Sequence, residues 1–142
     1  MRQTIYDENV IGPWVCQRTG GQYFPDSGAR AIGLLRDGVL VAGVLFEHYN
    51  GRSIAMHVAG EGKDWMTRDF LMECFRYPFV QLGVHKIIGL VDSSNKDARR
   101  LDEHLGFRME AKIAGAAPRG DLLIFTMTRE QCRFLERKVA NG

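Results

Sequence analysis

The sequence predicts a mixed α/β domain, and two features of its pattern lead to that fold class. In the first half, Asp37-Gly38 and Asn50-Gly51 separate apolar runs and suit tight turns between antiparallel strands, because Gly and Asn tolerate positive φ. In the second half, helical spacing of apolar residues precedes the continuous apolar run Lys86 to Val91, typical of a buried parallel strand. A meander that feeds a helix and then a parallel strand defines the class. The length of 142 residues suits one domain, 1–142.

The elements expected before residue 60 are one short helix and three strands. The helix covers about Asn9 to Arg18, with Pro13 in its first turn or limiting its length. Its apolar face would be Val10, Ile11, Trp14 and Val15. The Gly-rich loop Gly20 to Gly28 then leads into the sheet. The three strands of the meander are Ala31 to Arg36, Val39 to His48 and Arg52 to Ala59.

The elements expected after residue 60 alternate between helix and strand. A helix opens near Asp64 and runs to about Tyr77 or beyond Pro78. After the strand Lys86 to Val91, Ser94 and Asp97 resemble a capping box for a helix that ends at Gly106. The inner stripe of that helix is Ala98, Leu101 and Leu105. Two strands, Phe107 to Ile113 and Asp121 to Met127, precede a C-terminal helix with a Thr128/Gln131 capping box and with Cys132 and Leu135 on its inner side.

Composition and charge exclude several functional classes. The net charge is only +2 and both signs alternate along the chain, so no basic face for nucleic acid is expected. The polar start Met1 to Glu8 is unlike a signal peptide, and the longest apolar run, Val39 to Phe46, is too short to span a membrane. Three scattered cysteines suit reduced thiols in the cytoplasm, and four isolated histidines show no metal-ligand spacing. We therefore expect a cytoplasmic protein without nucleic-acid, membrane or metal binding.

Three segments in a fixed order resemble one protein family. They are Tyr77 to Ile87 (YPFVQLGVHKI), Val91 to Asn95 (VDSSN) followed by Ala98, and Leu105 to Arg108 (LGFR). The chain is similar over about Gly38 to Phe134 to the GNAT N-acetyltransferases, and most to the branch that contains the ribosomal-protein N-terminal acetyltransferases. This resemblance implies a central, mostly antiparallel sheet with one splayed parallel strand pair, flanked by helices. Leu105-Gly106-Phe107 also reads as a simple helix stop, so it is used only to place the fold.

The resemblance implies an acyl-coenzyme A-dependent N-acyltransferase. Such an enzyme transfers an acyl group, here expected to be acetyl from acetyl-CoA, to a primary amine of a protein N-terminus, a lysine or a small molecule. Two alternatives stay open: a GNAT-fold module that binds coenzyme A or a protein partner without catalysis, and an unrelated α/β interaction domain. A homodimer formed through the last strands or a sheet edge is also consistent with the family.

The resemblance also implies a site for the acyl donor. The pantetheine arm would bind backbone groups of Val58 and Ala59 where two parallel strands part, and the pyrophosphate would bind a loop at a helix N-terminus, where free N–H groups favour anions. The loop residues assigned to this site are Gly60, Gly62, Lys63, Trp65, Met66 and Thr67. The family's loop has small residues at fixed positions, and two registers fit here: one places bulky Trp65 at a glycine position, and the other uses Gly60 and Gly62.

Three residues of the following helix are further candidates for the donor site. Asn95 either caps the helix, contacts the pantetheine, or does both. Arg99 and Arg100 lie in the first turns of this helix, beside where the adenosine 3′-phosphate often lies in the family, and the alternative interpretation is a solvated helix face.

The candidates for acid–base catalysis are few. GNAT enzymes commonly use a Glu acting through water as the base and a Tyr as the acid, and in this sequence Asp102 stands where many members have the Tyr. His57 is the first candidate base, because imidazole titrates in the useful range and the residue lies on the strand facing the thioester. Glu47 is the second candidate. Strand alternation points His57 either at the substrate groove or at solvent.

Overall fold

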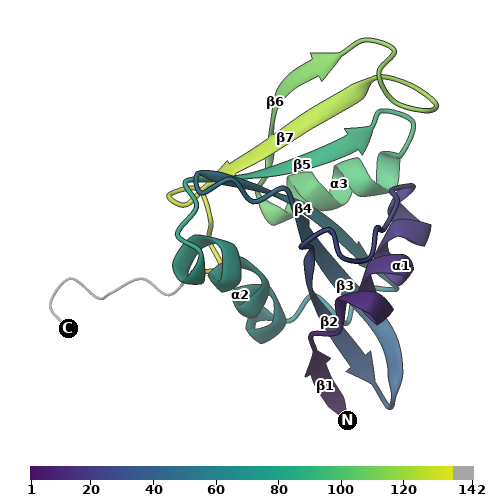
Figure 1. Cartoon of the computed structure of the whole chain (residues 1–142), viewed down its shortest axis with the longest axis vertical. Coiled ribbons are helices and arrows are strands. Elements are labelled where there is room, and N and C mark those ends of the chain that lie inside the picture. Colours follow the sequence, from purple (N-terminus) through teal and green to yellow (C-terminus); the bar gives the residue numbers. More distant parts are fainter. Residues whose placement is uncertain (136–142) are drawn as a thin grey trace, which may run out of the picture.

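One seven-stranded sheet forms the centre of the molecule, which we describe for residues 1–135 from a computed structural model (Figure 1). Its strand order is β1-β2-β3-β4-β5-β7-β6, and β4 and β5 are the one parallel pair of neighbours among these strands. The strands are β1 (Arg2–Ile5), β2 (Arg30–Arg36), β3 (Val39–Glu47), β4 (Ser53–Gly60), β5 (Lys86–Asp92), β6 (Arg108–Ile113) and β7 (Leu122–Thr128). The mixed sheet confirms the predicted class.

Helices cover the two faces of the sheet unequally (Figure 1). Helix α1 (Glu8–Thr19) packs on β2, β3 and β4 and shares a small core with them, which contains Ile11 and Val15. Helices α2 (Arg68–Arg76) and α3 (Lys96–Leu105) contribute to a larger core on the other face. No helix within residues 1–135 is long and apolar enough to cross a membrane.

The N-terminal segment differs from expectation in two ways. Strand β1 was not predicted, because four residues with only Ile5 apolar give no periodic signal, and the strand exists by pairing with the edge of β2. The predicted first helix is confirmed with one more residue at each end, and the Asp7 side chain caps it by accepting from the Asn9 N–H at 3.0 Å. Pro13 lies inside the helix rather than in its first turn, and Val10 is exposed rather than part of the inner face.

The two predicted turns of the meander have different geometries. Asp37 and Gly38 both have positive φ, 51° and 80°, so the tight primed turn between β2 and β3 is confirmed. The connection from β3 to β4 is longer than the predicted two-residue turn and covers residues 48–52. Within it, the Asn50 side chain accepts from the backbone N–H groups of Arg52 and Ser53, and His48 has a φ of 58°.

Both central helices begin later than predicted. Helix α2 starts at Arg68 rather than near Asp64, because Thr67 is the N-cap and accepts from the Phe70 N–H. It continues into the π-helical turn η1 (Tyr77–Gln81), which contains Pro78. Helix α3 is capped by Asn95, whose side chain accepts from the Ala98 N–H at 3.1 Å, and not by Ser94.

The C-terminal part follows the prediction as far as the structure describes it. Gly106 ends α3 with a φ of 108°, as expected, and β6 and β7 form an antiparallel pair. Thr128 and Gln131 exchange the expected capping hydrogen bonds, yet the residues up to Leu135 form turns rather than a helix. The rest of the expected C-terminal helix lies outside the described residues.

Two paired glycines bring α1 close to the sheet. Gly33 of β2 and Gly43 of β3 are partners in the strand register. A Cβ atom on Gly43 would lie 2.8 Å from Val15 Cγ2 and 2.9 Å from Ile11 Cγ2, and one on Gly33 would lie 2.9 Å from the Ile11 side chain. Because these α1 side chains are fully buried, they have no free space into which to move.

We expect Gly43→Val to destabilise the fold by about 1–3 kcal/mol, because the added atoms overlap Val15 and Ile11. The free energy of unfolding, measured with urea, checks this value. Val39→Ala is the control, since that side chain on the same strand is 63% exposed and its loss should change stability by less than about 0.5 kcal/mol. Equal stability of Gly43→Val and the wild type would contradict the close packing of α1.

Candidate functional site

The parallel strands β4 and β5 stay together over only three residue pairs. Ser53, Ile54 and Ala55 pair with Lys86, Ile87 and Ile88, and the register ends there. The remaining half of β4 still pairs with β3 on its other side, through Val44↔Val58 and Gly43↔Ala59. The backbone of β4 that faces β5 beyond Ala55 is therefore free for a further partner. Val58 and Ala59, the residues predicted to meet the pantetheine arm, lie in this free half.

The loop after β4 is shaped by Trp65, whose side chain turns inward. Trp65 is 2% exposed and belongs to the larger core, and its indole N–H donates to the Gly62 carbonyl at 3.0 Å. A Cβ atom on Gly60 would lie 2.2 Å from this indole, so only glycine fits there. The bulk of Trp65 therefore does not obstruct the outer side of the loop, where Gly62 and Lys63 are exposed.

The end of this loop presents the first turn of α2. The N–H groups of Met66 and Thr67 are already used, because they donate to the carbonyls of Lys63 and Trp65 at 3.2 and 2.8 Å. The next N–H groups belong to Arg68 and Asp69, which open the helix and have no intrahelical acceptor. A negatively charged group would find donors and the positive end of the helix dipole here.

The three candidates on α3 have separate surroundings. Asn95 caps the helix, which confirms that interpretation of the residue, while its contact with pantetheine stays a prediction. Arg99 donates to Glu103 one turn later at 3.0 Å, an exposed pair on the helix surface. Arg100 is exposed as well, so both arginines are accessible to an anion from solvent.

The two candidate bases, which the sequence analysis treated as alternatives, form a pair. His57 Nε2 lies 3.0 Å from Glu47 Oε2, and the two side chains are only 18% and 14% exposed. The register explains the contact: Leu45 pairs with His57 and Glu47 with Ala55, so both side chains project from the same face on neighbouring strands. The hydrogen bond from His57 lowers the pKa of Glu47, and the partial burial of the carboxylate opposes this shift.

An ionised Glu47 fixes the roles of the two imidazole nitrogens. The carboxylate only accepts hydrogen bonds, so Nε2 carries the proton that it shares with Glu47. When the ring is neutral, Nδ1 is then an acceptor, and it has no hydrogen-bond partner within residues 1–135. The arrangement is that of a carboxylate–histidine pair with one nitrogen ready to take a proton.

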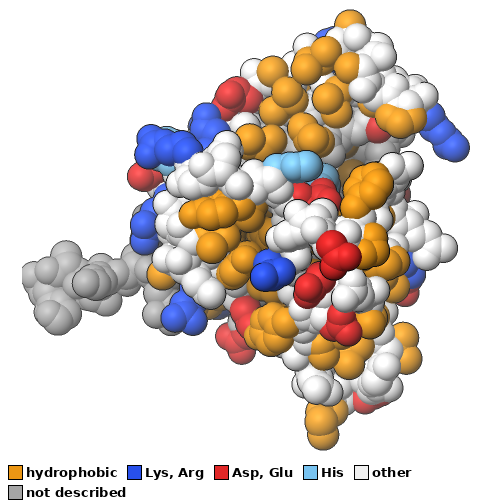
Figure 2. Space-filling model, in the orientation of Figure 1, with side chains coloured by type: hydrophobic (Ala, Val, Ile, Leu, Met, Phe, Trp, Pro, Cys, Tyr) orange, Lys and Arg blue, Asp and Glu red, His pale blue; other side chains and the backbone are white. Residues whose placement is uncertain are grey.

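A hollow opens beside this pair, between the end of β3 and the Gly-rich loop. Its volume is about 280 Å³, and it is lined by Gln22, Phe24, Ser27, Glu47 and His48. The positive φ of His48 turns the chain at this point, and the sequence analysis gave that residue no role. Figure 2 shows acidic side chains gathered beside a histidine near the middle of the face drawn. Within the lining of the hollow, Glu47 supplies the negative charge.

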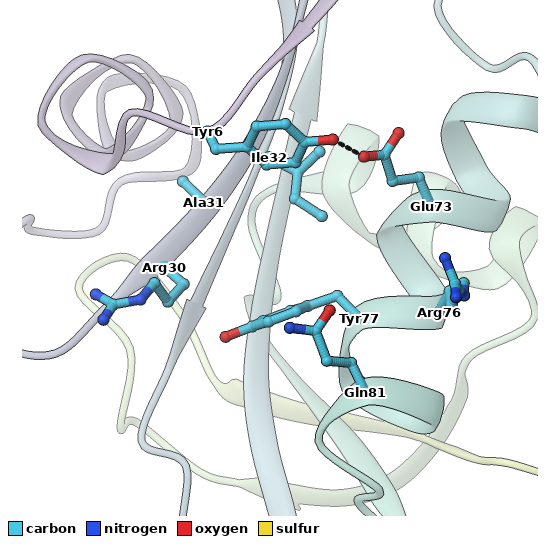
Figure 3. A pocket seen from close by; sticks show the side chains of 8 residues that line it. All are labelled: Tyr6, Arg30, Ala31, Ile32, Glu73, Arg76, Tyr77 and Gln81. Carbon is cyan, nitrogen blue, oxygen red and sulfur yellow. Dashed lines mark hydrogen bonds between the residues drawn. The ribbon is translucent and has the colours of Figure 1, made fainter.

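A larger pocket, of about 350 Å³, lies away from the predicted site. Figure 3 shows its lining, in which the Tyr6 hydroxyl donates to Glu73 while Arg30 and Tyr77 stand on opposite walls. Arg30 and Tyr77 also line a smaller hollow of about 180 Å³ that reaches Glu47. The larger pocket, in contrast, contains none of the residues that were predicted to act in catalysis or to bind the donor. Size alone therefore does not identify the site.

Asp102 of α3 is a buried carboxyl group that lies against β5, next to the point where β5 parts from β4. The residue is 9% exposed, and its Oδ2 lies 2.9 Å from the point where a Cβ atom of Gly89 would be, so the glycine in β5 makes room for it. Burial raises the pKa of Asp102 to about 7, and the nearby His57 opposes the rise. Within residues 1–135 no group of three or more side chains is arranged to hold a metal ion.

We expect the raised pKa of Asp102 to make stability depend on pH. In the folded state Asp102 keeps its proton up to about pH 7, whereas the ordinary pKa of an Asp side chain is 3.8. The contribution of this group to stability is therefore fully present below about pH 4, and it is lost as the pH rises through about 7. Between pH 5 and 8 the wild type should lose about 3 kcal/mol relative to Asp102→Asn, which cannot ionise. Urea unfolding at both pH values measures this difference. The control, exposed Asp97→Asn on the same helix, should follow the wild type, and parallel curves for Asp102→Asn would contradict the shift.

Comparison with known proteins addresses the fold. No protein-family model and no curated protein matches the chain. Among solved structures, a variant of the spermidine N-acetyltransferase SpeG from Vibrio cholerae superposes with a TM-score of 0.71 at 17% identity, over 89% of this chain and 93% of that one. A GNAT-family acetyltransferase from Bacillus anthracis gives 0.58 at 18% identity, over 72% and 66% of the two chains.

These identities are too low to carry an activity or a substrate across, so the likeness applies to the fold. The resemblance to the ribosomal-protein branch stays a prediction. The seven-stranded mixed sheet, its parallel pair and the flanking helices have the fold of the GNAT acetyltransferases.

Proposed function

We propose that this protein is an acetyl-CoA-dependent N-acetyltransferase that acts on a primary amine. The observation that carries the proposal is the opening between β4 and β5 with the Glu47–His57 pair at its edge. A binding module would need the opening but would have no use for a partly buried carboxylate–histidine pair with a free nitrogen. The pair therefore favours an enzyme over a non-catalytic coenzyme A-binding module.

The donor fits the opening by simple hydrogen-bond chemistry. The two amide groups of a pantetheine arm are suited to pair with the free backbone of β4 around Val58 and Ala59, as an added strand would. The pyrophosphate would then lie at the exposed loop around Gly62 and Lys63 and at the first turn of α2. This arrangement places the thioester near the middle of β4, next to His57.

The acceptor would approach from the α1 face, through the hollow beside Glu47. His57 Nδ1 takes the proton that the amine loses on attack, and Glu47 stabilises the imidazolium that forms. A backbone N–H of Val58 or Ala59 would polarise the thioester carbonyl. The surface near the hollow is acidic, which favours a cationic amine. Burial is the main cause of the raised pKa of Tyr23, and the negative charges of Glu8, Asp7 and Asp26 add to it.

The finer assignments form part of the same proposal. The acceptor is a protein N-terminus, a lysine or a small amine, and the structural neighbours that act on spermidine support the small amine. The three cysteines, Cys16, Cys74 and Cys132, are buried, and cysteines that pack in this way are consistent with a reducing cytoplasm. A homodimer through the outer strands fits the exposed edge strand β6.

We expect acetyl-CoA to bind with a micromolar Kd, and Lys63→Glu to raise that Kd about tenfold, because it places a negative charge beside the pyrophosphate. Isothermal titration calorimetry measures both values. Lys112→Glu is the matched control, since it makes the same charge reversal on β6, where Lys112 is also exposed. The absence of acetyl-CoA binding by the wild type would rule out the proposed function.

We expect His57→Asn to lower kcat at least about 100-fold and Glu47→Gln to lower it less, with the Kd for acetyl-CoA unchanged, because the pair acts on the proton of the amine. Thiol release would be followed with spermidine, free lysine and a short peptide with a free N-terminus as acceptors. The exposed His85→Asn should behave as the wild type. Full activity of His57→Asn would show that another group is the base.

A further inference from the structure

The pocket of about 350 Å³ between β2 and α2 takes no part in the proposed acetyl transfer (Figure 3). Strand β1 ends at Ile5, which pairs with Gly33, so the outer edge of β2 has no strand partner at Ala31 and Ile32 within residues 1–135. These two residues form an apolar floor for the pocket. Its volume is at the low end of the range for small-molecule sites, about 300–1,000 Å³, which suits a ligand with a single ring.

Two tyrosine rings reach into this pocket from different elements. Tyr6 follows β1, and its hydroxyl donates to Glu73 of α2, so the exposed ring is held across the edge of β2. The Tyr77 ring is held by an edge-on contact with Phe46, with ring centroids 5.0 Å apart. Figure 3 shows Tyr6 and Tyr77 on opposite sides of the open space. A planar ring between them would gain the contacts that aromatic side chains favour.

The π-helical turn η1 places Tyr77 and Gln81 together on the wall of the pocket. The Leu82 N–H donates to the Tyr77 carbonyl at 2.9 Å, five residues back, where an α-helix would use the residue four back. Pro78, inside the turn, has no N–H with which to continue the regular pattern. Turns of this kind are rare and occur frequently at functional sites, so η1 supports a binding site independently of the pocket volume.

The polar side chains of the pocket mostly offer hydrogen-bond donors. Arg76, Gln81 and the Tyr77 hydroxyl have no side-chain partner among residues 1–135, and all three can donate. Burial raises the pKa of Tyr77, and the positive charge of Arg30 opposes this rise, so the guanidinium and the phenol lie near each other. An acceptor-rich group would therefore find two donors at the Arg30–Tyr77 end of the pocket.

The charge of the lining is positive overall. Arg30 and Arg76 stand against one carboxylate, Glu73, which already accepts from Tyr6. Arg30 also lies 3.7 Å from Glu8, but this exposed pair is weak and leaves most of the guanidinium N–H groups free. A carboxylate in the pocket would therefore form charge-assisted hydrogen bonds.

We propose that this pocket binds a small aromatic carboxylate, with its ring between Tyr6 and Tyr77 and its carboxylate between Arg30 and the Tyr77 hydroxyl. The ring lies on the apolar floor that Ala31 and Ile32 provide, and Arg76 adds positive charge at the other end. This site is separate from the proposed acetyl transfer and does not rest on it.

Isothermal titration calorimetry with phenylacetate tests the site. Phenethylamine keeps the ring and reverses the charge, whereas acetate keeps the carboxylate without the ring, so these two serve as matched ligands. We expect phenylacetate to bind with a Kd on the order of 100 μM, and the other two at least about tenfold more weakly. Saturating acetyl-CoA should leave the Kd unchanged, because the pocket contains none of the residues predicted to bind the donor.

Two variants locate the carboxylate. Arg30→Gln should weaken phenylacetate binding at least about tenfold, because it removes a charged donor, and Tyr77→Phe about threefold, because it removes only the hydroxyl. Arg108→Gln, which changes an exposed arginine on β6 at the far edge of the sheet, should bind as the wild type. The melting temperatures of both variants should equal that of the wild type, since Arg30 is exposed and Tyr77→Phe keeps the ring on Phe46.

Three results would overturn the proposal: no binding of phenylacetate by the wild type, equal binding of phenethylamine, or unchanged binding by Arg30→Gln. None of them concerns acetyl-CoA, so a failure here is distinguishable from a failure of the proposed function.

Discussion

The three-residue pairing of β4 with β5 is the constraint on which the site depends. A parallel pair that continued for the length of both strands would satisfy every backbone group between them and leave no room for a substrate. Here the strands part after Ala55 and Ile88, while each stays bonded to its antiparallel neighbour, β3 or β7. The sheet therefore tolerates an internal opening at little cost, because every strand at the opening still has one complete partner.

Packing around the opening is arranged so that bulky groups face away from it. Trp65 fills the core under Gly60, which leaves the outer side of the loop to small and flexible residues. On the other face, the paired glycines Gly33 and Gly43 let α1 lie directly on β2 and β3. The charge of Glu47 reaches Cys16 of α1, where it adds to burial in raising the pKa of that thiol. The side chains of His57 and Glu47 are themselves mostly out of solvent, at 18% and 14% exposed.

The pKa values of Glu47 and Asp102 follow from the surroundings of each side chain. Glu47 accepts a hydrogen bond from His57 and has a lowered pKa, whereas the Asp102 side chain accepts none from the described residues and has a raised pKa. The surroundings of these two carboxyl groups therefore shift their pKa values in opposite directions. His57 is hydrogen-bonded to Glu47 and is close enough to Asp102 to oppose the rise of its pKa.

The sequence by itself determined the local elements. The Asp37-Gly38 turn, the strand from Lys86 to Val91 and the stop of α3 at Gly106 were predictable because turn chemistry, an apolar run and a helix C-cap are properties of neighbouring residues. Only the tertiary structure decided that Trp65 turns inward, that Glu47 and His57 meet, and that Asp102 is buried beside Gly89. Those outcomes depend on the register of neighbouring strands and on how closely the helices pack on the sheet. Both are set by residues far apart in the sequence, so the residues on one side of a contact do not determine them.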